Sequence, residues 1–470
     1  MVERGLEPDF SPAAQGQLAQ IPAAPPDAAA EVKDLRALAW CSIDNDDSRD
    51  LDQLSVSEEL AGGATRILVA VADVDALVPR GTPLDVHAAK NTTSVYTAAQ
   101  VFPMLPERLS TDLSSLNSGV DRLAVILEYV VGADGAVTGG QISRARVHNY
   151  AKLAYDSTAA WLEGQGPMPD AVARAPGMDQ QLRVQDRAAQ RLRRRRFASG
   201  ALQLQSIEPR AVFEGERLVG LAAQEQNRAR QLIEEFMVAG NGISAGYLQA
   251  KKTGSLRRIV RSPERWAKIV AVAAELGEKL PAEAESKALE GFLERRRAAD
   301  PLRFPDLSLV IVKLMGRGEY IAEGPGQDSP GHFGLAVRDY SHTTAPNRRF
   351  PDLITHRLLK AALAGQPPPY AFAELSQLAA HCTAMEAAAA KVERQVRKSA
   401  AALVLANRIG ETFEGIITGA AEKGTFVRIL APPVEGRILR GEKGLSVGDK
   451  VKVTLQATDF ERGYLDFVKV

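Results

Sequence analysis

Five aspartates in the short stretch from Asp44 to Asp52 are the residues best suited to chemistry. Apolar sequence flanks them on both sides, which is unusual for a solvated acidic surface. Asp50 and Asp52 are two positions apart, so in an extended segment they project to the same side while Leu51 points into a core. Carboxylates forced together raise one another's pKa, and a hard divalent cation with oxygen ligands is the usual relief. The stretch therefore predicts a metal site.

The alternatives for this acidic cluster are a solvated loop and a calcium site of the EF-hand type. An EF-hand loop needs glycine at its sixth position and glutamate at its twelfth. Counted from Asp44, these positions hold Arg49 and Ser55. We therefore favour a metal site of another kind over a calcium-binding loop of the EF-hand type.

A second dense stretch runs from Gly331 to Lys360. It holds three of the six histidines, two arginines and an aspartate: His332, His342, His356, Arg348, Arg349 and Asp352. Pro346 and Pro351 fix a rigid turn that leads into a helix. An arginine held on such a turn suits bidentate contact with a phosphate, whereas the histidines are too scattered for a zinc site.

The composition bounds the class of protein. The 470 residues are 45% apolar and 25% charged, with 58 basic and 58 acidic side chains, which is ordinary for a globular protein of two or three domains. Two cysteines, Cys41 and Cys382, provide neither a disulfide framework nor a zinc cluster. The sequence shows no signal peptide and no apolar run long enough to span a bilayer, so we expect a cytoplasmic protein without a membrane anchor.

Hydrophobic patterns predict strands first and helices later. The predicted strands cover 65–78, 122–131 and 139–147, with a long excursion over 79–121 between the first two. The predicted helices cover 179–197, 228–246, 263–280, 307–315, 351–364 and 370–406. Before them, two short helices are predicted from Ser11 through Leu18 and from Asp27 through Leu35, an arrangement compatible with a helix-turn-helix.

The last 60 or so residues have a different pattern, in which short strands recur between glycine turns. Five such strands between residues 410 and 470 predict a small closed barrel. Aromatic and basic residues on it would form a surface for stacking bases and binding phosphates. These residues are Phe413, Phe426 and Tyr464 with Lys423, Arg428, Arg437 and Arg440.

Three stretches carry a resemblance to a known family. They are Ser42-Ile-Asp-Asn-Asp-Asp-Ser-Arg-Asp-Leu-Asp52, then Thr93-Ser-Val-Tyr96 with 103–110 and 112–117, and then 331–335 with 340–350 and 352–356. In these stretches the chain resembles the ribonuclease II (RNB) family of exoribonucleases, over residues 33–405. The C-terminal barrel looks like the S1-type OB-fold that usually ends members of this family.

The resemblance implies an α+β fold in three parts. These are a short helical region over 1–33, an RNB catalytic domain with a mixed sheet wrapped by helices over 34–406, and an S1-type OB-fold over 407–470. It also implies a 3′→5′ exoribonuclease that hydrolyses single-stranded RNA processively to nucleoside 5′-monophosphates, with Mg²⁺ as cofactor. We expect a monomer that acts in RNA degradation and processing.

Site residues carry over from the family by position. Asp44, Asp50 and Asp52 match its magnesium-binding aspartates, with Asp52 the most critical for cleavage. Arg348 matches the arginine that contacts the scissile phosphate. Tyr96 matches the aromatic residue that stacks on the terminal nucleotides.

Further RNA contacts are expected outside this set. Glu235, together with Asn241, is expected to anchor the RNA end, although Glu234 fits the sequence equally well. Phe426 is expected to bind RNA from the barrel. The run Arg193–Arg196 is either a solvated helix face or a lining of the RNA channel.

The chain departs from the family pattern at three places. A fourth aspartate usually follows the third, and here the position holds Gln53, so Asp46 or Asp47 would have to compensate for the missing charge. A second base-stacking position, aromatic in some relatives, is Leu204. About 33 residues before the catalytic domain cannot hold the two cold-shock barrels that relatives commonly carry, so we expect a less crowded channel entrance that admits duplexes with a 3′ overhang.

Two other functions remain open from the sequence. The first is a catalytically inactive RNB fold that binds RNA as a regulator, and Gln53 is the feature that favours it. A structure-specific endonuclease is the second, and it would give internal fragments in place of mononucleotides. Incubation of a labelled oligo(A) with Mg²⁺ separates all three.

Overall fold

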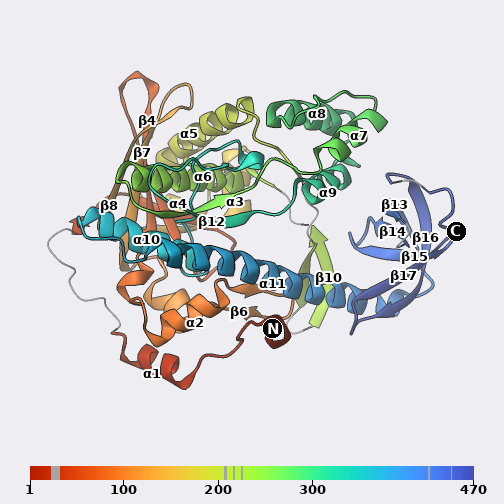
Figure 1. The fold of residues 1–470 in the computed structure, drawn as a ribbon, viewed down its shortest axis with the longest axis horizontal. Coiled ribbons are helices and arrows are strands. Elements are labelled where there is room, and N and C mark those ends of the chain that lie inside the picture. The colour runs from red at the N-terminus through yellow and green to blue at the C-terminus, as the bar shows by residue number, and fades with distance from the viewer. Residues whose placement is uncertain (23–31, 206–208, 215–216, 224–225, 422–423, 446) are drawn as a thin grey trace.

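The computed structural model describes residues 1–22, 32–205, 209–214, 217–223, 226–421, 424–445 and 447–470. A large part built of a sheet and many helices makes up most of the chain, and a small barrel stands beside it at the C-terminal end (Figure 1). Among the described residues, no helix combines the length and the apolar character needed to cross a membrane.

A six-stranded mixed sheet forms the centre of the large part. Its strands are β1 (Val32–Asp34), β2 (Trp40–Asp44), β3 (Gln53–Glu59), β4 (Thr65–Ala72), β7 (Asp121–Val131) and β8 (Val137–Ala154), in the order β1-β8-β2-β3-β4-β7. The long strand β8 pairs in parallel with β1 and β2 and antiparallel with β7. It therefore joins both ends of the run β2-β3-β4-β7, and the sheet curls.

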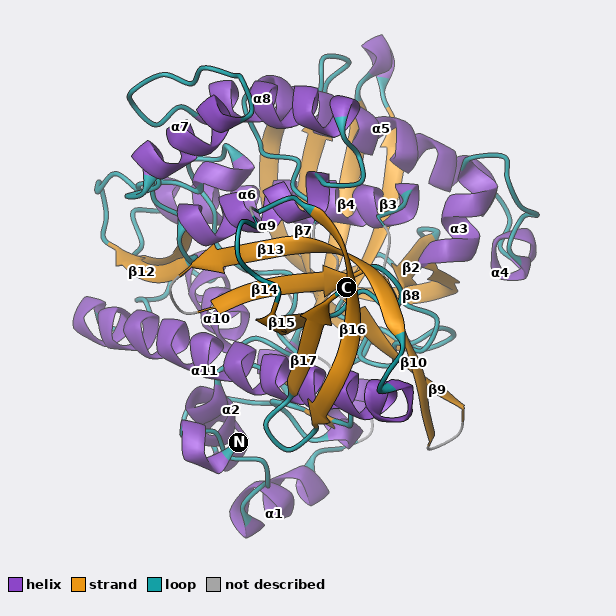
Figure 2. Cartoon of the chain, turned by 90° about the vertical axis from the view of Figure 1, so that its right-hand side faces the viewer, coloured by secondary structure: helices purple, strands orange, loops and turns teal. Residues whose placement is uncertain are grey.

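Two long helices, α5 (Met178–Ala198) and α6 (Arg228–Ala250), pack against this sheet (Figure 2). Ser55 and Ser57 of β3 donate hydrogen bonds to Gln185 and Gln181 of α5, at 2.7 and 2.9 Å. Positions two apart on a strand and four apart on a helix share one face, so the two polar pairs fix the register of α5 on β3. Both serines are buried.

Further helices and short strands surround this core. They are α1 (Pro12–Gln20), α2 (Pro83–Asn91), α3 (Tyr155–Leu162), α4 (Asp170–Arg174), α7 (Trp266–Glu275), α8 (Ser286–Ala299), α9 (Phe304–Met315), α10 (Phe350–Leu363), α11 (Phe372–Leu405), β5 (Val95–Tyr96), β6 (Val101–Phe102), β9 (Pro209–Glu214), β10 (Arg217–Ala223), β11 (Ser255–Ile259) and β12 (Glu319–Glu323). Helix α11 runs from the large part to the barrel (Figure 1). Helices α7, α8 and α9 share an apolar core of their own.

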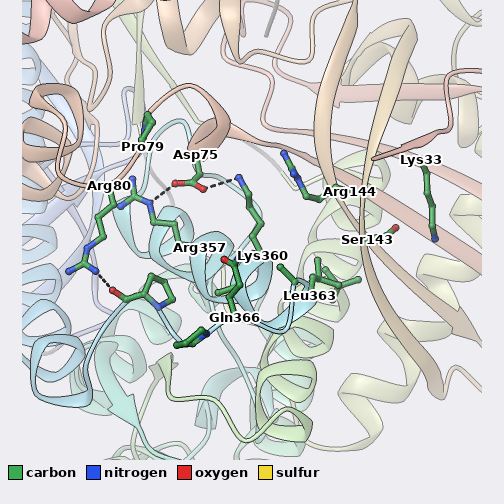
Figure 3. Close-up of a pocket in the computed structure, with 15 residues that line it drawn as sticks. Lys33, Asp75, Pro79, Arg80, Ser143, Arg144, Arg357, Lys360, Leu363 and Gln366 are labelled. Carbon is green, nitrogen blue, oxygen red and sulfur yellow. Dashed lines mark hydrogen bonds and ion pairs between the residues drawn. The ribbon is translucent and has the colours of Figure 1, made fainter. Parts of the chain in front are cut away.

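A network of ion pairs anchors α10 beside the end of β4 (Figure 3). Lys360 Nζ lies 2.8 Å from carboxylate oxygens of both Asp73 and Asp75. Arg357 Nε lies 2.7 Å from Asp75, and Arg144 of β8 lies 2.9 Å from Asp73. Asp75, Arg144, Arg357 and Lys360 line an open cavity of about 620 Å³. The network fixes α10. The turn from Ala345 to Arg349, called the arginine-rich turn below, directly precedes this helix.

The C-terminal residues form a closed five-stranded barrel, as predicted. Its strands are β13 (Thr412–Ala421), β14 (Gly424–Ile429), β15 (Glu435–Arg440), β16 (Lys450–Asp459) and β17 (Tyr464–Lys469), in the order β13-β14-β15-β17-β16. Two aromatic rings of its core, Phe413 and Phe467, meet edge to face with 6.3 Å between centroids. The expectation that Phe413 belongs to a stacking surface is therefore wrong, because this ring fills the barrel interior.

A buried ion pair docks the barrel on α9. Arg428 Nε and Nη2 donate to the two carboxylate oxygens of Asp306 at 2.8 and 2.7 Å, and both side chains are largely buried. The prediction that Arg428 offers its charge to phosphate is wrong, because Asp306 takes it up in a bidentate pair. Tyr464 and Phe426 remain on the outer side of the barrel, exposed and half-buried respectively, and Lys423 lies outside the described residues.

Most predicted elements are confirmed with small shifts at their ends, but two predictions are wrong. Residues 32–34 form β1 and not the end of a helix, because they pair in parallel with β8; residues 27–31 of that predicted helix lie outside the described part. The strand predicted over 65–78 ends at Ala72 and is followed by a short helical turn. The excursion over 79–121 contains α2, β5 and β6.

Candidate active site

The acidic stretch forms the connection between β2 and β3. Asp44 is the last residue of β2, and its Oδ1 accepts hydrogen bonds from the Asn45 backbone N–H at 2.6 Å and the Ser48 hydroxyl at 2.9 Å. Asp44 therefore closes the turn that brings the chain back toward β3. Leu51 is buried, as its position between Asp50 and Asp52 predicts.

Asp52 lies against the arginine-rich turn, almost 300 residues away in the sequence. The Asn347 backbone N–H donates to its Oδ1 at 3.0 Å, and Arg348 Nε donates to its Oδ2 at 3.2 Å. The Asp52 side chain is 2% exposed and that of Arg348 is 42% exposed. The pair is therefore buried on its acidic side and open on its basic side.

The turn that carries Arg348 is held from the first turn of α10. Asp352 Oδ1 accepts from the Ala345 backbone N–H at 2.8 Å and from Arg349 Nη2 at 2.7 Å. Arg349 is thus committed to the turn itself, which leaves Arg348 as the arginine that faces outward. Arg348 is the arginine that the sequence predicts to contact phosphate, and it is the one that Asp352 leaves free to do so.

Tyr96 completes the group. Its hydroxyl donates to Asp50 Oδ2 at 3.1 Å, while its side chain stays 43% exposed. Two residues before it, the Ser94 backbone N–H donates to the Arg348 carbonyl oxygen at 3.0 Å. Asp50, Tyr96, Arg348 and Asp52 are therefore linked by a series of contacts, with the backbone of Ser94 standing between Tyr96 and Arg348, so the structure brings together the principal residues predicted from the sequence.

The electrostatics of this group are those of carboxylates short of positive charge. Burial raises the pKa of Asp52 to about 7, although Arg348 opposes the shift. Burial also raises the pKa of Asp50, and the neighbouring Asp44 adds to that shift. The pKa of the Tyr96 hydroxyl is raised by burial and by Asp50, so it is a hydrogen-bond donor at neutral pH. An added cation would relieve all three.

The donors fit a hard divalent cation in kind. Asp44, Asp50 and Asp52 offer only carboxylate oxygens, which Mg²⁺ prefers. Burial raises the pKa of Asp50 and of Asp52, and a cation between them would favour their charged forms. Among the residues that the structure describes, no three acidic, histidine or cysteine side chains are gathered closely enough to hold a metal ion as they stand.

A cavity of about 480 Å³ opens beside this group. Asp50, Tyr96 and Asn45 line one part of it, and Glu393 and Arg397 of α11 line another. A volume of this size is typical of small-ligand sites. The cavity therefore gives Asp50 access from solvent between the acidic stretch and α11.

Glu235 lies in a different place from the aspartates. Its Oε1 is 2.6 Å from Arg196 Nη2, and Arg196 also contacts Glu234 at 2.7 Å. Burial raises the pKa of Glu235 while Arg196 opposes the shift. This pair lines a separate cavity of about 370 Å³, so the described contacts do not bring Glu235 to the acidic stretch.

The other predicted residues divide between structure and surface. Asn241 donates to the Tyr340 hydroxyl and accepts from the Thr343 backbone N–H, at 3.1 and 2.9 Å. Leu204 packs against the apolar core of α7, α8 and α9. Gln53 is the half-buried first residue of β3 and pairs in register with Val71.

Sequence reasoning missed Tyr155 and Arg230, which stand near the acidic turn. The Arg230 guanidinium lies 4.3 Å from the centroid of the Tyr155 ring, and its Nη2 donates to Asn45 Oδ1 at 3.0 Å. Burial and then Asp44 raise the pKa of Tyr155. The position of Tyr155 directly after a long strand is the signal that points to it, since strand ends are common places for site residues.

Comparison with known proteins gives matches to two domain families. The family model of the RNB domain matches residues 32–365. The family model of the RNase II-type exonuclease C-terminal S1 domain matches residues 411–470. The chain belongs to the RNB family. The RNB match covers the sheet, the acidic stretch and the arginine-rich turn, so the family resemblance stated from the motifs is confirmed.

The curated relatives of this chain include proteins named Ribonuclease R. That of Escherichia coli is 32% identical over 94% of this chain and 58% of its own length, and that of Vibrio cholerae is 30% identical over 92% and 56%. The chain thus spans less than two thirds of the length of either RNB relative. The structure of Mycoplasma genitalium RNase R in complex with ribose-methylated single-stranded RNA has the same fold, with a TM-score of 0.88 and 22% identity over 100% of this chain and 77% of that chain.

Proposed function

We propose that this RNB chain is a 3′→5′ exoribonuclease that hydrolyses single-stranded RNA processively to nucleoside 5′-monophosphates in RNA degradation and processing. The observation that carries the proposal is the pair of contacts beside an open cavity, Tyr96 with Asp50 and Arg348 with Asp52. The names of the relatives and the single-stranded RNA bound to the M. genitalium protein support the substrate class.

Asp44, Asp50 and Asp52 would hold a Mg²⁺ ion. When bound, this ion supplies Lewis-acid stabilisation of charge on the phosphate and activation of a water molecule. The raised pKa of Asp52 supports this assignment, because an ion between these carboxylates favours their charged forms. Gln53 adds an amide and no charge at the next position, so three carboxylates carry the site.

Arg348 would bind the scissile phosphate. Its Nε is held by Asp52, and a guanidinium has further N–H donors in the same plane for phosphate oxygens. Its side chain is open to solvent on that side. Removal of one such donor to a developing oxyanion commonly costs 10²–10³-fold in rate, which is roughly 3–4 kcal/mol.

Tyr96 and the barrel would hold the RNA strand. The exposed Tyr96 ring would stack on a terminal base for about 1–3 kcal/mol without preference for sequence. Phe426 and Tyr464 on the barrel would add further stacking contacts. Glu235, paired with Arg196 in its own cavity, would anchor the strand only after that pair opens.

The proposed setting is a monomer in the cytoplasm. Both cysteines, Cys41 and Cys382, are buried thiols, which suits a reducing compartment. Burial raises the pKa of both thiols, so neither is a reactive nucleophile.

The test is a 5′-labelled oligo(A) incubated with Mg²⁺ and sized on a gel. The wild-type chain is expected to shorten it stepwise and release mononucleotides. Asp52→Asn is expected to lower the rate at least about 10³-fold, more than the loss of a single oxyanion donor, while RNA binding remains. Asp170→Asn, an 89% exposed carboxylate on α4, serves as the matched control and is expected to behave as wild type.

Full hydrolysis by Asp52→Asn would contradict the role of the acidic stretch. Internal fragments in place of mononucleotides would make the chain an endonuclease. RNA binding without any cleavage by the wild-type chain would make it an inactive RNA-binding member of the family.

A further inference from the structure

We propose that Tyr96 is a positioning residue for Asp50, so that one side chain both receives the terminal base and orients a carboxylate for the cation. This inference rests on the proposed function and assigns the Tyr96 hydroxyl a role separate from that of its ring. The distinguishing contact is the hydrogen bond from the hydroxyl to Asp50 Oδ2, at 3.1 Å.

The backbone of Tyr96 is held from two directions. Its N–H donates to Glu393 Oε1 of α11 at 2.9 Å. On the other side, the Ser94 backbone N–H donates to the Arg348 carbonyl oxygen, and Thr93 forms an isolated bridge with Arg349. The tyrosine therefore takes its position from α11 and from the arginine-rich turn.

These anchors fix where the hydroxyl falls. The segment is tied to the same turn whose Arg348 contacts Asp52, so Asp50 and Asp52 are both oriented by one short stretch of backbone. A tyrosine hydroxyl is a rigid extension of its ring, so it reaches a set distance from a fixed backbone. The hydroxyl therefore fixes the orientation of the Asp50 carboxylate through Oδ2.

The ring is available while the hydroxyl is engaged. Tyr96 is 43% exposed and lines the same cavity as Asp50. Stacking uses the ring face and the hydrogen bond uses the ring edge, so the two roles do not compete. Hydrogen-bond partners behind a metal-binding carboxylate typically change metal affinity or activity by 10–100-fold.

Substitution with phenylalanine separates the two roles. Tyr96→Phe keeps the ring and removes the hydrogen bond, whereas Tyr96→Leu removes both. The control is Tyr150→Phe, since Tyr150 is similarly exposed, at 46%, and its hydroxyl donates only to the Arg36 carbonyl oxygen among the described contacts. All four chains are compared at full length.

Two binding measurements read out the variants. The first is the dissociation constant of Mn²⁺ from the RNA-free chain, by electron paramagnetic resonance. The second is the dissociation constant of a non-cleavable 2′-O-methyl oligo(A) in EDTA. For Tyr96→Phe we expect Mn²⁺ affinity to fall about tenfold and RNA affinity to stay within about twofold of wild type. For Tyr96→Leu we expect both affinities to fall, and for Tyr150→Phe neither.

The outcomes separate this inference from the proposed function. Mn²⁺ affinity of Tyr96→Phe equal to that of wild type, in a chain that releases nucleotides, would overturn the positioning role and leave the exonuclease in place. If Tyr96→Leu lost RNA affinity but kept the Mn²⁺ affinity of wild type, Tyr96 would be a stacking residue only. A wild-type chain that neither binds Mn²⁺ nor releases nucleotides would overturn the proposed function and this inference together.

Discussion

Two pairs of aspartates at one edge of the sheet have the same spacing and opposite electrostatics. Asp50 and Asp52 come directly before β3, and Asp73 and Asp75 come directly after β4, with Ala72 N–H bonded to the Asp52 carbonyl oxygen at 3.0 Å. Asp52 and Asp73 are both almost fully buried. Burial acts to raise the pKa of both, but Lys360 and Arg144 outweigh it at Asp73, whose pKa is lowered. At Asp52 burial prevails, and the pKa rises to about 7.

The difference lies in the number of cations supplied by the protein. Lys360, Arg357 and Arg144 surround the second pair at 2.7–2.9 Å. The first pair receives only Arg348 Nε at 3.2 Å among the described contacts, and it has other carboxylates as neighbours. A cluster that the fold neutralises serves structure, whereas a cluster left short of charge is prepared for a cation from solution.

The largest difference should appear when the buried aspartate of each pair is replaced with asparagine. Asp73→Asn leaves Lys360 and Arg144 in a buried site without that carboxylate, and should lower the free energy of unfolding by about 3–5 kcal/mol. Asp52→Asn should leave that free energy unchanged or higher in EDTA, because it removes a poorly compensated charge. Urea denaturation measures both, and a large loss of stability in Asp52→Asn would break the comparison.

Arginine-to-lysine substitutions should sharpen the contrast. Arg348→Lys keeps the charge but loses the planar donors, so we expect kcat to fall about 10²-fold with stability unchanged. Arg357→Lys loses contacts to Asp75, Tyr370 and the Val78 carbonyl oxygen, and should lower the free energy of unfolding by about 2–3 kcal/mol.

The measurement for this pair is kcat per folded molecule beside the denaturation midpoint. Arg357→Lys should retain most of its kcat once the folded fraction is corrected for. If Arg348→Lys and Arg357→Lys changed kcat and the denaturation midpoint in the same way, the separation into a structural and a chemical cluster would be wrong.

The smallest effect is the opposite dependence of stability on pH, measured in EDTA. A lowered pKa means that Asp73 stabilises the fold above its unfolded value of 3.8, and that this stability is lost as the pH falls through the lower folded value. A raised pKa means that Asp52 favours the fold while protonated, and that this advantage is lost as the pH rises from about 4 to about 7.

The stability of Asp52→Asn relative to wild type should therefore grow between about pH 4 and pH 7 and then level off. The deficit of Asp73→Asn should be constant over this range and shrink only at lower pH. Denaturation curves at several pH values measure both differences. The same slope for both variants would contradict the assignment.

The sequence predicts those features that depend on local pattern. The five barrel strands follow from glycine turns between short apolar runs, and α5, α6, α10 and α11 follow from long periodic segments. Motif recognition placed Asp52 and Arg348 in one site although almost 300 residues separate them. Spacing alone would not have done so, because Asp73 and Asp75 have the same spacing as Asp50 and Asp52.

The features that the sequence does not predict depend on distant partners. Residues 32–34 become a strand because β8, more than 100 residues later, offers a parallel edge. Arg428 becomes a docking residue because Asp306 lies opposite it across a domain boundary. Glu235 is taken up by Arg196 for the same reason. In each case the local sequence fits either role, and a contact with a residue distant in the sequence decides between them.

If Asp44, Asp50 and Asp52 form the cation site, Mn²⁺ titration of three RNA-free chains will distinguish this site from the cluster of Asp73 and Asp75. We predict that the wild-type chain and Asp73→Asn, measured where it remains folded, bind Mn²⁺ with similar affinity, and that Asp52→Asn loses this binding. Undiminished Mn²⁺ binding by Asp52→Asn, or its loss in folded Asp73→Asn alone, would contradict the account.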